Sequence, residues 1–301
     1  MLSSIILKKN GISLVIAVPD GVDGLYRGTR FDWSGVILSC SLMGHEYIGH
    51  WFDIADPFKH DNVSGPAEEF SQTGYKEASS PAIFFKPGIG LLESEPGMPY
   101  DWFHTYKIID GGVRTLNQDD DSVAFRHEVD NIYDYTKIVS IEDQGFSIRH
   151  FLKNTGSKTL SGIVYCHNFF VPDNLLPGPE TLIRFPFDPE GKWREDTVSA
   201  HYTNGGIAFD RTLEEGEKAY AENIYPEPVN GAKEGYSFSF GNRTTGAVLD
   251  VSCNRPACKV KFWSNHRVSC VEPYIKYNIS PLEEFSWEIV YKLRLRENII
   301  E

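Results

Sequence analysis

Hydrophobic and polar residues alternate with a period of two along most of the chain, which is typical of strands buried on one face. Turn signals such as Asp110-Gly-Gly112 and Gln118-Asp-Asp-Asp121 separate these segments at close spacing. The segments with strand character are 5–7, 13–18, 35–40, 106–109, 112–116, 122–129, 133–141, 236–240, 247–253, 258–263 and 285–295. This rhythm predicts an all-β protein built as a large antiparallel β-sandwich.

Two long segments interrupt the alternation. Residues 41–80 are rich in polar residues and chain breakers, and residues 168–193 contain five prolines. Long irregular segments beside a sheet usually carry function, so we expect both to form the rim of a cleft. A short helix at 212–221 is the one helical candidate. With no linker or internal repeat, the 301 residues are expected to form a single domain, 1–301.

A histidine stands at the end of one predicted strand. Residues 145–170 read as strand, tight turn and strand, with Asn154-Thr-Gly156 supplying a glycine that tolerates positive φ. The resulting hairpin would place His167, flanked by aromatic residues, on a rigid sheet, where its rotamer can be held for chemistry. The alternative is an ordinary histidine of the core.

A second motif lies about one hundred residues after His167. Cys270-Val-Glu-Pro-Tyr274 is followed by a predicted loop and a final aromatic strand. In order and spacing, the two motifs together resemble the galactose mutarotase-like superfamily, which contains the aldose 1-epimerases. Members carry Asn-His-x-Tyr-Phe-Asn where this chain has Cys166-His-Asn-Phe-Phe170, and Leu-Glu-Pro-Gln where it has Val271-Glu-Pro-Tyr274. The resemblance covers the second half of the chain well and the first half loosely.

The resemblance implies a β-supersandwich with an open cleft on a concave sheet, and interconversion of the α and β anomers of an aldose. By resemblance, Glu272 acts as the base and His167 as the acid, with no cofactor and no metal required. A carboxylate and an imidazole suit this task because modest tuning brings both pKa values near neutrality. We expect the two side chains to face each other across a gap about as wide as a pyranose ring. For Glu272 alone, a surface carboxylate before a turn-forming proline is the alternative.

Three further sugar contacts follow from the same resemblance. Lys86 lies in a glycine-rich turn where epimerases carry an arginine, and His104 is followed by Thr-Tyr rather than by the usual Gly-Gly. Asp210 lies where epimerases place an aspartate that binds sugar hydroxyls. These departures leave the first two positions open, and a turn cap is the alternative for Asp210.

The segment 26–35 is dense in polar and aromatic residues. Arg27 and Arg30 offer planar donor forks, which would match a sugar phosphate or a uronate if either side chain reached the cleft. A buried structural ion pair with Asp32 is the alternative.

Charge and cysteine content narrow the range of partners. With 42 acidic and 29 basic residues, the net charge of −13 should repel a phosphate backbone, so we expect no nucleic acid partner; the resemblance implies a small-molecule sugar substrate. Lys8-Lys-Asn-Gly11 interrupts the apolar N-terminal stretch, so we expect no membrane association and a cytoplasmic protein. We expect a monomer or a homodimer. The five cysteines are expected to be mostly reduced and buried, and the spacing of Cys253 and Cys258 does not fit a zinc site.

Two other functions remain open. The first is a carbohydrate-binding protein that keeps the cleft without turnover, since fold does not fix function. The second is a glycoside hydrolase or polysaccharide lyase, for which Asp210 and Glu272 would supply the pair of carboxylates. The presence of both His167 and Glu272 favours the epimerase.

Overall fold

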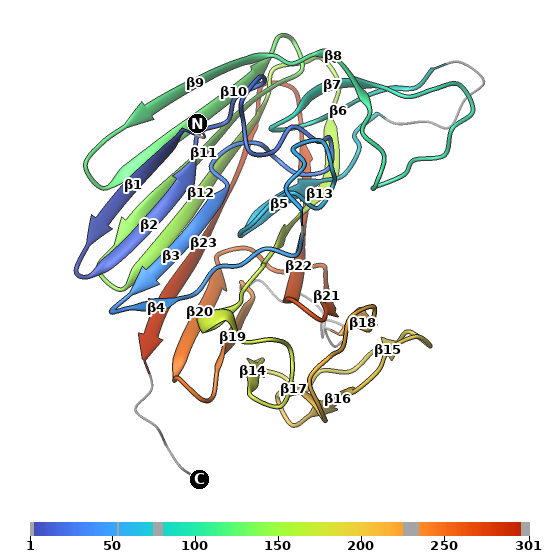
Figure 1. Ribbon diagram of the computed structural model, residues 1–301. Helices are drawn as coiled ribbons and strands as arrows, with labels where there is room; N and C mark the ends of the chain where they lie inside the picture. The colour runs from blue at the N-terminus through green and yellow to red at the C-terminus, as the bar shows by residue number, and fades with distance from the viewer. Residues whose placement is uncertain (1–2, 53, 75–80, 225–234, 296–301) are drawn as a thin grey trace.

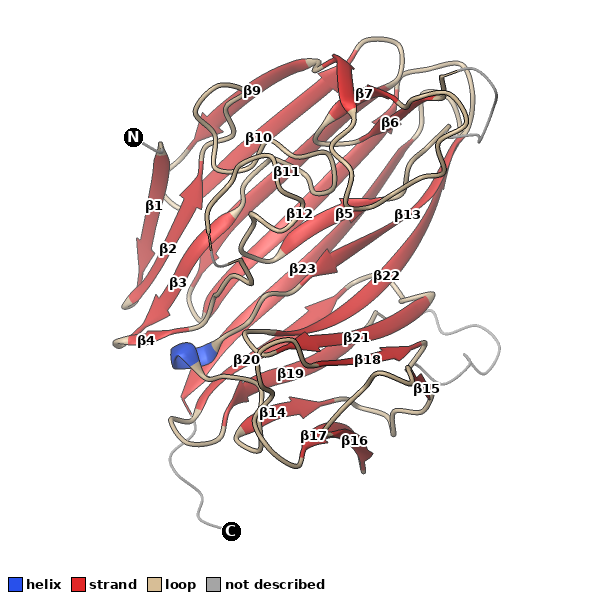
Figure 2. Ribbon diagram, turned by 45° about the vertical axis from the view of Figure 1, so that its right-hand side comes forward, coloured by secondary structure: helices blue, strands red, loops and turns tan. Residues whose placement is uncertain are grey.

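The computed structural model describes residues 3–52, 54–74, 81–224 and 235–295. Within these residues, every strand pairing is antiparallel, and the strands form two large sheets and two small ones (Figures 1 and 2). The predicted antiparallel β-sandwich is confirmed. No helix in the described part of the chain is long and apolar enough to cross a membrane.

The larger sheet has ten strands. In spatial order they are β16 (Ala200–Thr203), β17 (Gly206–Phe209), β14 (Thr181–Arg184), β19 (Ser237–Asn242), β20 (Ala247–Cys253), β23 (Glu284–Leu295), β12 (Gly145–Asn154), β11 (Tyr133–Glu142), β10 (Ser122–Val129) and β9 (Val113–Gln118).

The second large sheet has six strands. In spatial order they are β15 (Lys192–Trp193), β18 (Lys218–Glu222), β21 (Lys259–Asn265), β22 (Ser269–Ile279), β13 (Leu160–His167) and β5 (Ala67–Phe70). In Figure 1, β9 to β12 run on the left of the molecule, and β13 and β22 run to the right of them.

Two small sheets complete the fold. One joins β1 (Ser4–Lys9), β2 (Ile12–Ala17), β3 (Ile37–Leu42) and β4 (His45–Glu46), and the other joins β6 (Ile83–Lys86), β7 (Gly90–Glu93) and β8 (Lys107–Asp110). A short 3₁₀ turn, η1 (Pro172–Asn174), follows β13.

Alternation of side chains builds the main core. In β10, every second residue from Val123 to Val129 is buried, and β13 sends Val164 and Cys166 into the same cluster. Because successive side chains of a strand point to opposite faces, each large sheet contributes one apolar face to the space between them. Cys40, Cys166, Cys253 and Cys270 are buried free thiols, as expected, while Cys258 is exposed.

The predicted hairpin around 145–167 is wrong. β12 pairs with β11 and β23 in the ten-stranded sheet, whereas β13 pairs with β22 and β5 in the six-stranded sheet. The chain therefore crosses from one layer of the sandwich to the other between Asn154 and Leu160. Gly156 does not have positive φ; instead, the Asn154 side chain accepts a hydrogen bond from the Gly156 N–H and donates to the carbonyls of Lys158 and Ile279.

Two other local expectations also fail. The helix predicted at 212–221 is absent, because alternation within its second half forms β18, which buries Ala219 and Ala221. The segment 41–80 is not wholly irregular, since it contains β4 and β5; its residues 53 and 75–80 lie outside the described part of the chain.

A cluster of charged groups lies between the two large sheets. Lys137 of β11 forms an ion pair with Glu68 of β5 and donates to the Ser34 carbonyl at 2.9 Å. His150 Nε2 lies 3.4 Å from Glu68 Oε1, and Asp32 Oδ2 lies 4.0 Å from Lys137 Nζ. All four side chains are almost fully buried.

Candidate active site

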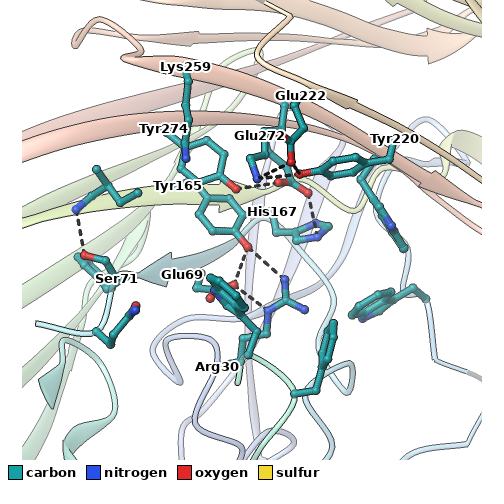
Figure 3. A pocket seen from close by; sticks show the side chains of 18 of the residues that line it. Arg30, Glu69, Ser71, Tyr165, His167, Tyr220, Glu222, Lys259, Glu272 and Tyr274 are labelled. Carbon is teal, nitrogen blue, oxygen red and sulfur yellow. Dashed lines mark hydrogen bonds and ion pairs between the residues drawn. The ribbon is translucent and has the colours of Figure 1, made fainter. Parts of the chain in front are cut away.

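A cavity of about 490 Å³ lies on the face of the six-stranded sheet that is turned away from the main core (Figure 3). Alternation along the strands selects the lining residues. On β13, Ile163, Tyr165 and His167 face the cavity, while Val164 and Cys166 face the core. By the same rule the neighbouring strands contribute Glu69, Tyr220, Glu222, Lys259, Lys261, Trp263, Glu272 and Tyr274.

His167 and Glu272 meet at the centre of this lining. Nε2 of His167 lies 3.2 Å from Oε1 of Glu272, and the residues are only 2% and 5% exposed. The expected gap of a sugar ring between them is therefore wrong: the two side chains share one cavity but touch. Phe169 stacks on the imidazole with ring centroids 4.2 Å apart, which fixes the ring plane.

The path of β22 explains how the two groups meet. The ladder between β13 and β22 ends at Tyr165 and Tyr274, so Pro273 has no partner on the β13 side. A proline, which lacks an N–H, is tolerated at such an edge. The Asn168 side chain donates to the Val271 carbonyl at 2.8 Å where the ladder has stopped.

Burial shifts the pKa values of Glu272 and His167 so that the neutral form of each group is favoured. Loss of solvent raises the pKa of Glu272 to about 7, although Arg30 and a 3.1 Å hydrogen bond from the Tyr274 hydroxyl favour the carboxylate. Burial, followed by repulsion from Arg30, lowers the pKa of His167 well below its usual value. An acid and a base that share one proton between them can carry out general acid–base chemistry.

Arg30, one of the predicted contacts, does line the cavity. Its Nε donates to Glu69 Oε2 at 2.7 Å, and the Tyr165 hydroxyl donates to the same oxygen at 2.5 Å. Burial alone would raise the pKa of Glu69, but Arg30, Lys86 and the Tyr165 hydroxyl together hold it below its usual value. Glu69 is therefore a carboxylate held in place by an arginine.

The other predicted sugar contacts do not line the cavity. Lys86 is fully buried behind it, where it donates to the Arg30 carbonyl at 2.6 Å. His104 lies outside, and the two residues before it, Trp102 and Phe103, line the cavity instead. The Arg27 guanidinium lies 4.4 Å from the centre of the Phe58 ring. Asp210 is exposed and pairs with His201 at 3.3 Å.

The rim expectation holds for only one of the two long segments. Residues 41–80 contribute Trp51, Glu69, Phe70, Ser71 and Gln72 to the cavity. Residues 168–193 contribute none of its lining, although the residues on either side of the segment, His167 and Arg194, both line the cavity. That second segment instead includes β14, which lies inside the ten-stranded sheet between β17 and β19, and β15, which is an edge strand of the six-stranded sheet.

The sequence contained a signal for several residues that motif reasoning missed. Lys259, Lys261 and Trp263 alternate with the core residues Val260 and Phe262, so the strand pattern alone places them together on one face. No cluster of three or more His, Cys, Asp or Glu side chains that could hold a metal ion occurs among the described residues.

Comparison with known proteins shows a likeness in structure alone. No protein-family model and no curated protein sequence matches the chain. The GalM/aldose epimerase homologue from C. elegans superposes with a TM-score of 0.60 at 10% identity, covering 99% of this chain and 100% of its own. A galactose mutarotase-like protein from Clostridium acetobutylicum gives 0.59 at 12% identity, over 98% and 96%. One from Lactobacillus casei gives 0.57 at 13% identity, over 97% and 100%. Over nearly its whole length, this chain therefore has the galactose mutarotase-like fold.

Proposed function

We propose that the protein is an aldose 1-epimerase, an isomerase in which His167 and Glu272 open and reclose a cyclic aldose. The observation that carries the proposal is the buried contact between these two groups, 3.2 Å apart, in a cavity of about 490 Å³. A volume of this order is typical of sites for small molecules. The solved structures with the same fold include proteins whose names refer to aldose epimerase and galactose mutarotase.

The reaction needs two proton transfers and no redox change. Glu272 takes the proton of the hydroxyl on C1 while His167 protonates the ring oxygen, and the C1–O5 bond breaks to give the open-chain aldehyde. Rotation about C1–C2 presents the other face of the aldehyde. Proton transfer in the reverse direction recloses the ring as the other anomer and restores both groups.

The pKa directions define the protonation state that can do this. Because the pKa of Glu272 is raised to about 7 and that of His167 is lowered, the pair holds one proton over the range between them. Before sugar binds, this proton resides on Glu272, and its transfer to His167 along the contact between Oε1 and Nε2 gives the carboxylate and the imidazolium that open the ring. Sugar that inserts its C1 hydroxyl and ring oxygen here replaces that contact with one hydrogen bond to each group.

Neighbouring side chains suit a sugar ring. Trp51 packs edge-on against Trp263 at 4.9 Å, and both line the cavity beside His167. Indole faces cover the apolar C–H face of a pyranose, while the guanidinium of Arg30 offers donors to hydroxyl groups.

A glycosidase reading has less support. Asp210, which would have been the second carboxylate, lies exposed outside the cavity, and Glu69 is engaged by Arg30. A hydrolase of the usual type needs two carboxyl groups flanking one bond.

The test is the rate of anomer interconversion on freshly dissolved α-aldoses, followed by polarimetry or exchange NMR. We expect a rate above the spontaneous background for at least one aldose. Binding without any acceleration across a panel of neutral and 6-phosphorylated aldoses would favour a non-catalytic carbohydrate-binding protein.

A further inference from the structure

Three cationic side chains gather at one end of the cavity, on the side of Glu272 opposite to His167. Lys259 and Lys261 extend from β21, which pairs with β22, and Arg194 follows β15. Figure 3 shows Lys259 beside Tyr274 and away from Arg30. The proposed acid–base mechanism uses none of the three.

The cations are only partly neutralised by the protein. Lys261 Nζ donates to the Tyr220 hydroxyl at 2.7 Å and lies 4.0 Å from Glu222 Oε1. Arg194 pairs with Asp196 at 3.2 Å, and the carboxylates of Glu222 and Asp196 are 62% and 44% exposed. Such solvated pairs contribute little and are easily exchanged.

Lys259 forms no ion pair with any residue that the structure describes. Its Nζ lies 4.3 Å from the centre of the ring of Tyr274, the residue of β22 that pairs with Lys259 across the ladder. Burial and repulsion from Lys261 lower its pKa, so a nearby negative charge would relieve an unfavourable arrangement. The carboxyl group of Glu272 does not supply that charge in full, because its pKa is raised to about 7.

The setting makes this cluster unusual for the molecule. A protein with a net charge of −13 repels anions in general, so an anionic ligand needs a local region of positive potential. A cleft walled by low-dielectric side chains strengthens such a local field. Lys259, Lys261 and Arg194 supply it within the same cavity as His167 and Glu272.

We propose that Lys259, Lys261 and Arg194 form an anion subsite and that the preferred substrate is an aldose carrying an anionic substituent, bound with its reacting C1 at His167 and Glu272. This inference rests on the proposed function, because it names the substrate class of the same site. The shared chemistry is a phosphate or a carboxylate group, and the two sources are a sugar phosphate and a uronic acid.

The experiment compares kcat/KM for glucose, glucose 6-phosphate and glucuronate in the wild type and three variants. Lys259→Met removes the charge at similar length, and Lys259→Arg restores it. Lys153→Met removes the charge of an exposed lysine on β12, outside the cavity, as the matched control. We expect the wild type to prefer one anionic sugar over glucose, and the anionic sugar that is preferred identifies the substituent.

Lys259→Met should lower the ratio of anionic to neutral kcat/KM by about 10-fold or more, the usual scale for a hydrogen bond to a charged group. Lys259→Arg should recover most of this ratio, and Lys153→Met should keep the wild-type ratio. A wild type that does not prefer either anionic sugar, or a Lys259→Met variant with the wild-type ratio, would overturn the inference.

A measurement on the wild type alone guards against misfolding of the variant. Inorganic phosphate should inhibit turnover of glucose competitively, and the inhibition should weaken as ionic strength rises. Absence of such inhibition would also overturn the subsite.

A failure of the proposed function can be distinguished from a failure of the anion subsite. If no sugar is turned over, calorimetric titration with glucose 6-phosphate and glucuronate replaces kinetics. Binding of either that depends on Lys259 would retain the anion subsite while the epimerase proposal is abandoned, and absence of binding would remove both.

Discussion

At the scale of single residues, the environment of His167 and Glu272 matters as much as their identity. Both groups are buried, so each is neutral over more of the pH range than it would be in water. A shared proton can then pass between them without creating two isolated charges. The short motifs around these residues pointed to the pair, whereas their direct contact and their pKa values depend on burial, which a sequence motif does not encode.

Substitution of either group should remove most of the catalysis. Glu272→Gln keeps the shape but removes the proton acceptor, and His167→Asn removes the titratable nitrogen. Each should lower kcat by on the order of 10²–10⁴, the usual contribution of one general acid–base group. The double variant should be little worse than the weaker single variant, because the two groups act as a unit. The measurement is the rate of α-to-β conversion above background, and a wild-type rate for Glu272→Gln would refute the assignment.

The pKa directions also predict the pH dependence of the reaction. Above about pH 7, Glu272 loses its proton while His167 is already neutral, so the pair no longer holds the proton that the reaction uses. At low pH, below the lowered pKa of His167, a second proton binds and no base remains. We therefore expect kcat/KM to fall as pH rises through about 7 and to fall again in acid. Rates corrected for spontaneous mutarotation that climb steadily from pH 7 to 9 would contradict this.

At the scale of elements, alternation predicts which strands exist but not which sheet each joins. β12 and β13 follow one another with a short connection and look like a hairpin in sequence, yet they lie in different layers. Their separation depends on long-range pairing with β23 and β22, which no local pattern specifies. The same limit explains Lys86. The sequence places it at a glycine-rich turn, but the full burial of its side chain at the end of β6 depends on contacts with distant parts of the chain.

Asn154 holds the crossing between the sheets and gives a direct test of it. Its fully buried amide donates to the carbonyls of Lys158 and Ile279, at 2.8 and 2.9 Å, so it joins the crossing loop to the end of β22. Asn154→Ala leaves both carbonyls without this donor and should lower the free energy of unfolding by about 1–3 kcal/mol. Lys158→Ala, which removes only an exposed side chain of the same loop, is the control. Equal stability of the two variants in urea denaturation would show that the amide does not hold the crossing.

At the scale of the whole molecule, charged groups buried between the two large sheets link the layers. The side chains of the neighbours Glu68 and Glu69 on β5 point to opposite faces of the sheet. Glu68 forms an ion pair with Lys137 of the ten-stranded sheet, and Glu69 forms one with Arg30 in the cavity. The acidic pair in the sequence gave no sign of this division, because each partner comes from a distant part of the chain. A single strand thus connects the candidate site to the core of the sandwich.

This arrangement predicts how stability depends on charge and pH. Burial alone would raise the pKa of Glu68, but Lys137 and His150 lower it to about 2. A depressed folded-state pKa stabilises the protein above the unfolded value, near 4.5, and that contribution is lost as pH falls from there toward 2. Lys137→Met leaves Glu68 as a buried charge without its cation and should cost about 3–5 kcal/mol in unfolding free energy at neutral pH.

The double variant Glu68→Gln with Lys137→Met separates loss of a charge partner from loss of packing. It removes both charges at once, so no unpaired ion remains buried, and replacing a buried pair is often close to neutral. We therefore expect it to be more stable than Lys137→Met alone at pH 7, with a weaker loss of stability between pH 4.5 and 2 than the wild type. Urea denaturation of the three proteins across this pH range measures both effects. If the double variant is no more stable than Lys137→Met, packing between the sheets, and not the compensation of the Glu68 charge, is what Lys137 provides.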